Sequence, residues 1–318
     1  MNSIYSHTPI YKRKKRKQPI KFLIITFLFT LIISIFAIPF TKDHSRNVKP
    51  FFKELDTPIV IAHRGGSAFP ENTLPAFEHS EQIGVDVLEF DIHMTKDGHL
   101  VAIHDFTVDR TTNGTGEVDS FTLDELQQLD AGYYFTDREG NYPFRNEGIT
   151  IPTVEEIFEQ FSHMDMNIEI KAQYPKAGPS EIEAKLWQLI QQYEMKDKVL
   201  LASFEQKIIN KFNELANGQV AISGGKNEVT KFVLLNKFFL SKLYNPKVDA
   251  LQMPTKVNLF NLADQKLVRN AQKLNMHVHY WTINDRETME ELLKLGADGI
   301  ITDDPELLME VMKELGMR

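Results

Sequence analysis

The sequence contains no cysteine among its 318 residues. This absence excludes disulfide bonds, thiolate metal sites and cysteine nucleophiles, and it leaves the redox compartment of the protein undecided. Extreme composition is also absent, because charged residues make up 25% and hydrophobic residues 42% of the chain. These fractions are ordinary for a globular protein and exclude a largely disordered one. The length allows one large domain or two small ones.

Basic residues are scarce in most of the chain. Residues 1–41 hold seven basic groups and no acidic group, so the remaining 29 basic and 44 acidic groups give residues 42–318 a net charge of −15. A body this acidic is a poor nucleic-acid partner, since phosphate binding needs clustered lysine and arginine. We expect an anionic substrate to be held locally, most simply by a bound cation.

A long uncharged run extends from Phe22 to Phe40. Its length matches a helix that crosses a hydrocarbon core of roughly 30 Å. The basic run Lys12–Lys17 precedes it, which by the positive-inside rule keeps residues 1–21 in the cytoplasm. We therefore expect a transmembrane anchor at 22–40, a linker at 41–57 and an extracellular catalytic body at 58–318. Cleavage as a signal peptide is the alternative, although the run is long and lacks a convincing cleavage motif.

Short β-branched runs alternate with helical patterns from residue 58 onward. This alternation is typical of an α/β protein with a (β/α)₈ TIM barrel. More runs are present than the eight barrel strands require, so one is either misassigned or lies outside the barrel, and 250–253 is the weakest. The predicted strands are 59–62, 87–91, 100–103, 167–170, 199–202, 220–222, 250–253, 278–282 and 299–301. The predicted helices are 74–83, 154–161, 181–193, 206–215, 262–274 and 287–295. Residues 105–152 interrupt the alternation, and we expect a small insertion after the third strand, beside the mouth of the active site.

Charged residues occupy the ends of two predicted strands. Residues two apart in a strand share a face, so Glu89 and Asp91 point the same way, and so do Glu169 and Lys171. Burying such groups at the end of an apolar strand is costly unless they have a purpose. The alternative is that both pairs are solvated strand ends.

The Asp97-Gly98 dipeptide predicts a hairpin between the second and third runs. If these two residues form the turn, counting outward brings Asp91 opposite His104. Directly opposed residues share a face, so we expect His104 to join Glu89 and Asp91 at one point. We expect His93, on the same hairpin, to be solvated.

His63-Arg64-Gly65-Gly66 follows the first predicted strand, at the end where barrel enzymes keep their catalytic residues. The two glycines let the backbone approach a ligand closely. Asn72 and Thr73 follow soon after, and capping of the helix that begins at Leu74 could by itself explain both.

These motifs together resemble the glycerophosphodiester phosphodiesterases. The resemblance covers about residues 58 to 310 and rests on nine segments in the family's order. They are His63-Arg64-Gly65, Glu71-Asn72-Thr73, Glu89-Phe90-Asp91, Thr95-Lys96-Asp97-Gly98, His104-Asp105, Glu169-Ile170-Lys171, Ser203-Phe204, Trp281-Thr282-Ile283-Asn284 and Thr302-Asp303-Asp304-Pro305. Single tripeptides would be weak signals, but nine in register are strong.

The resemblance implies a TIM barrel enzyme that hydrolyses glycerophosphodiesters to glycerol 3-phosphate and an alcohol. It implies that Glu89, Asp91 and Glu169 bind one divalent cation, and all-oxygen ligation suits Ca²⁺ or Mg²⁺. It implies that His63 and His104 are the acid/base pair. The remaining implied residues contact the phosphate or the rest of the substrate; they are Arg64, Asn72, Lys171 and Trp281. For Trp281, packing in the barrel is an equally good explanation.

Two rival functions remain open at this point. Another barrel phosphodiesterase, of the phosphatidylinositol-specific phospholipase C or lysophospholipase D type, would also use histidines. A catalytically inactive, membrane-anchored binding module is a second rival, which the retained residue types disfavour. The extracellular orientation favours deacylated phospholipids or polyglycerol-phosphate polymers as substrates. The alcohol released and the oligomeric state stay undetermined.

Overall fold

The computed structural model describes residues 23–30, 45–53, 55, 58–171 and 181–318. The chain divides into two units, Met1–Asp43 and His44–Arg318. In the first unit, residues 23–30 are helical. The rest of the predicted anchor at 22–40 lies outside the described residues. Within the residues that are described, no helix combines the length and apolar character that a membrane crossing requires.

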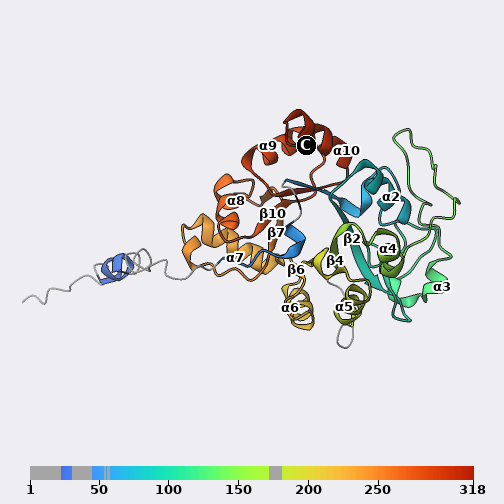
Figure 1. Cartoon of the computed structure of the whole chain (residues 1–318), viewed down its shortest axis with the longest axis horizontal. Helices are drawn as coiled ribbons and strands as arrows, with labels where there is room; N and C mark the ends of the chain where they lie inside the picture. The colour runs from blue at the N-terminus through green and yellow to red at the C-terminus, as the bar shows by residue number, and fades with distance from the viewer. Residues whose placement is uncertain (1–22, 31–44, 54, 56–57, 172–180) are drawn as a thin grey trace, which may run out of the picture. The chain divides into compact units, whose positions relative to one another are not determined.

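The second unit is a nearly closed barrel of eight parallel strands, which confirms the predicted fold (Figure 1). The strands neighbour one another in the order β6-β5-β4-β2-β1-β11-β10-β7, and an isolated parallel bridge from Ser223 to Ala250 joins the two ends. The barrel strands are β1 (Ile59–Ala62), β2 (Val87–Met94), β4 (Asp165–Ile170), β5 (Val199–Ala202), β6 (Ala221–Ile222), β7 (Ala250–Met253), β10 (His277–Tyr280) and β11 (Gly299–Thr302).

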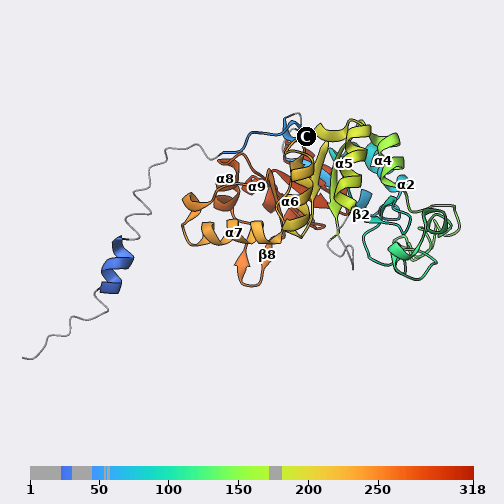
Figure 2. The same ribbon diagram turned by 90° about the horizontal axis from the view of Figure 1, so that it is seen from below.

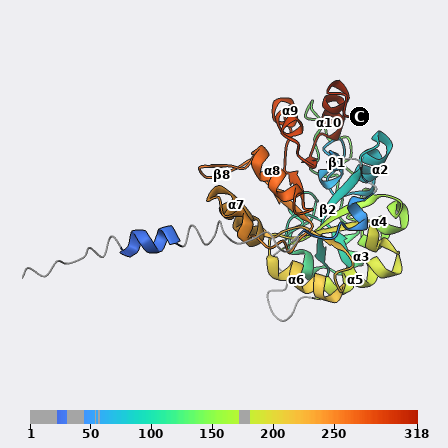
Figure 3. The same ribbon diagram turned by 60° about the vertical axis from the view of Figure 1, so that its left-hand side comes forward.

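Helices surround these strands as an outer ring (Figure 3). Capping explains several of their starts: Thr153 and Glu156 form a capping box at α4, and Asp304 caps α10 directly before Pro305. The helices are α2 (Leu74–Ile83), α3 (Leu123–Leu126), α4 (Val154–Phe161), α5 (Ile182–Gln192), α6 (Gln206–Leu215), α7 (Lys226–Lys237), α8 (Gln265–Gln272), α9 (Arg286–Leu295) and α10 (Pro305–Glu314). The sequence patterns did not predict α7 or α10.

Of the nine predicted strands, the one outside the barrel is β3 (Leu100–Ala102), which pairs antiparallel with β2. The weakest predicted run, 250–253, is the genuine barrel strand β7. Gln252 interrupts its apolar character, but Leu251 and Met253 are fully buried, which holds the strand in the barrel wall. A short hairpin outside the barrel, β8 (Lys256–Val257) with β9 (Phe260–Asn261), follows β7.

The β2–β3 turn is one residue longer than the Asp-Gly signal suggested. The Thr95 N–H donates to the His99 carbonyl at 2.9 Å, and the Gly98 N–H donates to the Thr95 carbonyl at 3.0 Å. Residues 96–98 therefore form a three-residue loop. Gly98 has a φ of 88°, the left-handed conformation that such a loop needs at its last position.

This longer turn shifts the register by one residue. Asp91 lies opposite Ile103, whose N–H donates to the Asp91 carbonyl at 3.0 Å. The predicted pairing of Asp91 with His104 is therefore wrong, and His104 follows the end of the strand. The expectation that His93 is solvated is also wrong, because it is 1% exposed and its Nε2 lies 3.1 Å from the His104 carbonyl.

Part of the predicted linker at 41–57 packs against the barrel. Phe51 and Phe52, in a short 3-10 helix (Pro50–Phe52), are buried beside barrel residues such as Ile61. Phe52 stacks on His277 with ring centroids 3.9 Å apart. Arg46 pairs with Asp249 at 2.6 Å. The residues from Arg46 onward thus belong to the catalytic body.

The insertion predicted at 105–152 has a small apolar core of its own. Val108, Val118 and Leu126 are fully buried in it. Arg110, in this insertion, binds Glu71, which in turn binds Arg64, so ion pairs join the insertion to the loop after β1.

Candidate active site

A cavity of about 500 Å³ opens at the carboxyl ends of the barrel strands. Side chains from different strand ends meet there because parallel strands finish at the same rim. The polar end of the cavity is lined by His63, Arg64, Glu89, His104, Glu169 and Lys171. With Trp281, seven of the nine residues predicted for the site line this cavity.

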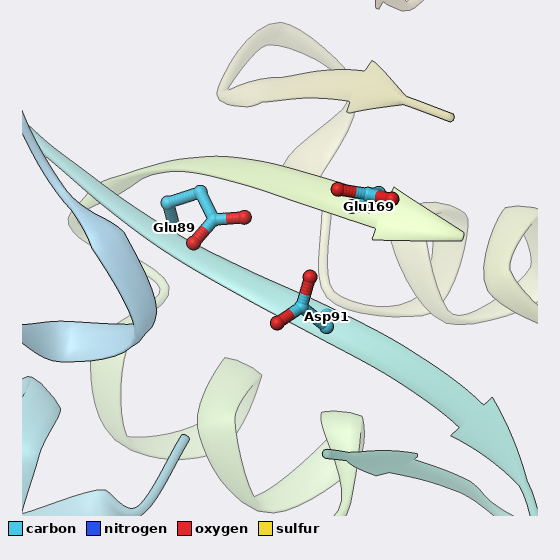
Figure 4. A group of neighbouring side chains, drawn as sticks. All are labelled: Glu89, Asp91 and Glu169. Carbon is cyan, nitrogen blue, oxygen red and sulfur yellow. The ribbon is translucent and has the colours of Figure 1, made fainter. Parts of the chain in front are cut away.

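Glu89, Asp91 and Glu169 form an acidic cluster (Figure 4). Strands β2 and β4 are parallel neighbours, and their register sets Asp91 beside Glu169. One carboxylate oxygen from each of the three residues lies within 4.8 Å of the others. The structure thus groups the three carboxylates that the family resemblance named, and this grouping follows from the alternation of β2 together with the β2–β4 register.

Burial and mutual repulsion perturb these three carboxyl groups. Burial, followed by the charge of Asp91, raises the pKa of Glu89 to about 8 and that of Glu169 to about 6. Burial also opposes ionisation of Asp91, but the charges of Lys171 and Arg64 outweigh it and lower the pKa of Asp91. The cluster therefore holds one firmly ionised carboxylate between two that resist ionisation.

Lys171, Arg64 and Asn72 surround Asp91. The Lys171 Nζ lies 2.7 Å from Asp91 and 3.1 Å from Glu169, and the Arg64 Nε lies 3.2 Å from Asp91. Asn72 donates from Nδ2 to Asp91 and accepts from the Asp91 N–H, both at 3.3 Å. Asn72 thus orients Asp91 and does not line the cavity. Of the two candidate caps, Thr73 occupies the N-cap position of α2, although its side chain makes no capping hydrogen bond.

The loop after β1 presents His63 and Arg64 to the cavity. Arg64 adopts a left-handed backbone with φ of 55°, and its N–H donates to Glu89 at 2.9 Å. Gly65 has a φ of 82°, and a Cβ there would lie 2.8 Å from the Ala76 Cβ. Only glycine combines that conformation with that close approach to α2.

His63 is oriented by a residue that the sequence did not single out. The Nδ1 of His63 lies 2.5 Å from Asp303, which follows β11. Asp303 in turn accepts from Asn284 Nδ2 at 2.6 Å. Burial alone would lower the pKa of His63, but its hydrogen bond with Asp303 and the charge of Glu89 outweigh burial and raise it.

His104, like His63, faces an aspartate through its Nδ1 atom. Its Nδ1 lies 2.7 Å from Asp105, and Arg110 donates from Nε to the same carboxylate at 2.5 Å. Burial is the largest influence on His104 and lowers its pKa. The pKa values of the two histidines are therefore displaced in opposite directions.

The comparisons with known proteins agree with this geometry. A model of the glycerophosphoryl diester phosphodiesterase family matches residues 63–307. The chain belongs to this family. A glycerophosphodiester phosphodiesterase of Caldanaerobacter subterraneus subsp. tengcongensis is 37% identical over 267 residues, which cover 81% of this chain and 99% of that relative. Like that relative, this protein is an enzyme, a glycerophosphodiester phosphodiesterase.

Solved structures share the barrel of this phosphodiesterase. An Oleispira antarctica phosphodiesterase in complex with the product sn-glycerol-3-phosphate is 25% identical, with a TM-score of 0.62, covering 81% of this chain and 97% of that one. A glycerophosphoryl diester phosphodiesterase domain from Mycobacterium tuberculosis is 19% identical with a TM-score of 0.69, covering 81% and 100% respectively. The second likeness concerns the fold alone.

The acidic cluster of the phosphodiesterase fits a divalent cation. Its donors are all carboxylate oxygens, and Glu89 and Asp91 are 4% and 1% exposed. Buried carboxylates that repel one another become stable when a cation lies among them, and hard oxygen donors match Ca²⁺ or Mg²⁺. These residues could therefore hold such an ion.

Trp281 both packs in the barrel and lines the cavity of the phosphodiesterase. It contacts the buried cluster that includes Phe51, and its ring makes an edge contact with Phe204 at 5.6 Å between centroids. The two explanations offered for Trp281 are therefore compatible. The Trp281–Thr282 peptide bond is cis.

Five residues of the site had no predicted role: Asp105, Asp303, Asn284, Glu71 and Arg110. All of them except Arg110 belong to matched motifs, so a signal for them was present in the sequence. Arg110 lies in the insertion and binds Asp105 and Glu71 at once, at 2.5 Å and 2.7 Å. No pattern in the sequence indicated that pairing.

Proposed function

We propose that the protein hydrolyses glycerophosphodiesters to glycerol 3-phosphate and an alcohol in a reaction that needs one divalent cation. The observation that carries this proposal is the joint placement of a buried three-carboxylate cluster and two oriented histidines around one cavity. A bound cation at Glu89, Asp91 and Glu169 would supply Lewis-acid polarisation of the phosphate.

His63 and His104 are the proposed acid/base pair. Each is held through Nδ1 by an aspartate, which leaves Nε2 for proton transfer. One histidine takes the proton of the attacking hydroxyl, and the other protonates the departing alkoxide. The raised pKa of His63 and the lowered pKa of His104 support His63 as the acid and His104 as the base.

Arg64 and Lys171 are the proposed phosphate ligands. Both cations lie within 3.2 Å of Asp91 and line the cavity beside the histidines. Fixed positive charges at this place stabilise the negative charge that grows on the phosphate oxygens during the reaction.

The test is a product assay across glycerophosphocholine, glycerophosphoethanolamine and glycerophosphoglycerol, each with Ca²⁺, with Mg²⁺ and with EDTA. We expect glycerol 3-phosphate in the metal-containing samples and none with the chelator. A cyclic inositol phosphate formed from a phosphatidylinositol control would instead favour a phospholipase C activity. If no diester is hydrolysed with either metal, the proposed function is refuted.

We further propose that residues 22–40 anchor the protein in a membrane with the barrel on the extracellular side. The uncharged run and the preceding basic residues support this proposal. Membranes from expressing cells should retain the protein after alkaline washing, and protease added to intact spheroplasts should digest the barrel. Release into the wash, or protection of the barrel from protease, would contradict the proposal.

A further inference from the structure

Arg110, in the insertion, lies at the centre of a chain of hydrogen bonds between His104 and Arg64. Its Nε donates to Asp105 Oδ2 at 2.5 Å, and the other oxygen of Asp105 lies 2.7 Å from His104 Nδ1. Its two Nη atoms donate to the two oxygens of Glu71, at 2.8 Å and 2.7 Å. Glu71 also accepts from Arg64 Nη1 at 3.1 Å. One guanidinium group therefore joins the proposed base to a proposed phosphate ligand.

This chain of hydrogen bonds connects the loop after β1, which holds Arg64 and Glu71, to the insertion that follows β3. The insertion lies beside α2 in two views of the molecule (Figure 1, Figure 2). Glu71, Asp105 and Arg110 do not themselves line the catalytic cavity. Any effect of Arg110 on a bound substrate must therefore pass through the residues that it holds.

Arg110 is better ordered than an ordinary surface arginine. Exposed ion pairs usually contribute little, because two flexible side chains must be held in one geometry. The Arg110 side chain is 48% exposed, but Val108 and Thr112, two residues away on either side, are fully buried. The Thr112 hydroxyl donates to the Val108 carbonyl at 2.8 Å, which closes the turn that presents Arg110. The paired contacts with Glu71 also use the planar guanidinium fork, which lysine does not possess.

The two carboxylates that Arg110 joins are kept ionised by it. Burial alone would raise the pKa of Asp105, but hydrogen bonds from Arg110 and from His104 outweigh burial and lower it to about 2. Burial also opposes ionisation of Glu71, but the hydrogen bond from Arg110 and the charge of Arg64 outweigh it and lower the pKa of Glu71. At neutral pH, Asp105 and Glu71 therefore both remain acceptors, the first facing His104 and the second facing Arg64.

We propose that Arg110 is a positioning residue that holds the base His104 and the phosphate ligand Arg64 in one fixed arrangement. This inference rests on the proposed function, which assigns those roles to His104 and Arg64. Without the guanidinium group, Asp105 and Glu71 lose the partner that they share, and the two groups at the cavity are no longer held together. Displacement of a catalytic group by about 1 Å is enough to cost ~10²-fold in rate.

The first test compares Arg110→Ala with Arg286→Ala in the hydrolysis of glycerophosphoglycerol by the full-length protein. Arg286 is the matched control because it also bridges two carboxylates, Glu310 and Glu314, and it does not line the cavity. We expect kcat/KM to fall at least ~10-fold for Arg110→Ala and to stay unchanged for Arg286→Ala. Circular dichroism checks that each variant folds. If Arg110→Ala does not fold, Arg110→Lys takes its place, with the same loss expected because lysine lacks the fork.

The outcomes of this test separate the inference from the proposed function. An active wild type with an equal kcat/KM in the folded Arg110 variant would overturn the inference and leave the proposed function intact. A wild type that does not hydrolyse the diester with either metal would refute the proposed function itself.

The second test separates positioning from simple attachment of the insertion to the barrel. Guanidinium chloride is added to Arg110→Ala at concentrations far below those that unfold proteins, and methylammonium chloride provides the same ionic strength as a control. A free guanidinium ion restores the contacts with Asp105 and Glu71, but it does not restore a covalent attachment. We expect guanidinium alone to raise kcat/KM at least ~5-fold, since its planar fork matches the two carboxylates. An equal response to the two salts would overturn the inference.

The third test measures whether Arg110 acts through Asp105, by a double-mutant cycle of Arg110→Ala with Asp105→Asn. Both substitutions break the same contact, so the double variant should lose about as much kcat/KM as the more impaired single variant. The losses should instead multiply when Asp105→Asn is combined with Arg286→Ala, because those two sites share no partner. Losses that multiply in the Arg110 cycle would show that Arg110 does not act through Asp105 and would overturn the inference.

Discussion

Asp303→Asn should impair catalysis by reversing the hydrogen-bonding sense of His63. In the structure, Asp303 faces His63 Nδ1 with one oxygen and accepts from Asn284 Nδ2 with the other. An asparagine there must keep its oxygen toward the Asn284 donor, so its NH₂ group faces His63. The Nδ1 atom then accepts, the ring proton moves to Nε2, and the neutral histidine has the wrong tautomer.

The expected loss of kcat/KM in Asp303→Asn depends on how exposed the His63–Asp303 pair is. Replacing a buried orienting aspartate in this way costs about 10⁴-fold in a serine protease triad. The Asp303 side chain is 38% exposed, so water can partly replace its role. We therefore expect kcat/KM to fall by about 10²-fold, equivalent to about 2.7 kcal/mol of transition-state stabilisation.

The dependence of kcat/KM on pH is a second measurement, and it would not change if Asp303 had only a structural role. Asp303 raises the pKa of His63, so its loss should lower that pKa. The limb of the kcat/KM profile that reports His63 should then shift to lower pH, whether His63 acts as acid or base.

Asp304→Asn is the matched control, because Asp304 caps α10 by accepting from the Leu307 N–H, and asparagine caps a helix equally well. The assay is glycerophosphoglycerol hydrolysis across pH at fixed metal concentration. A folded Asp303→Asn variant with normal kcat/KM and an unshifted limb would refute the reasoning.

Three further predictions concern other parts of the molecule. His104→Ala should lower turnover at least ~10²-fold, as loss of an acid/base group does. His99→Ala, at a partly exposed position of the hairpin, should not lower it. Equal turnover in the two variants would exclude His104 from the chemistry. Phe52→Ala should lower the free energy of unfolding by about 3–5 kcal/mol in a denaturant titration, because Phe52 is 7% exposed and stacks on His277. The control Val48→Ala, at a 40% exposed site, should change this free energy little. Lys171→Met leaves Asp91 without its nearest cation, so the variant should melt at a lower temperature than the wild type. Addition of Ca²⁺ or Mg²⁺ should raise the melting temperature of the variant more than that of the wild type. An unchanged melting temperature without metal would contradict the pairing.

Strand alternation predicted that Glu89 and Asp91 share a face, whereas only the family resemblance grouped Glu169 with them, and the register of β2 with β4 places it there. His104 lines the same cavity as Glu89, although the register used to place it opposite Asp91 was wrong. The Asp-Gly signal marks a turn but does not fix whether the loop has two or three residues, and Gly98 at the last position makes it three.

Long-range closure explains what the sequence did not reveal. Asp303 meets His63 across 240 residues of sequence because β11 pairs with β1 and closes the barrel. Helix α10 was missed although Asp304-Pro305 is a good start signal, and α7 was missed because its apolar residues face two ways, toward the core and toward the cavity. A helix that lines a cavity lacks the single clean apolar stripe on which pattern recognition depends.

The central claim is that a divalent cation held by Glu89, Asp91 and Glu169 enables hydrolysis of a glycerophosphodiester. The most direct measurement is the initial rate of glycerol 3-phosphate release from glycerophosphoglycerol as Ca²⁺ or Mg²⁺ is titrated into chelator-treated protein. The wild type should respond with a saturable rise that fits one site, and Glu89→Gln should need far more metal or not respond. The control Glu290→Gln, at a partly exposed position of α9, should behave as the wild type. Full activity of the wild type in excess EDTA, or an unchanged response of Glu89→Gln, would contradict the claim.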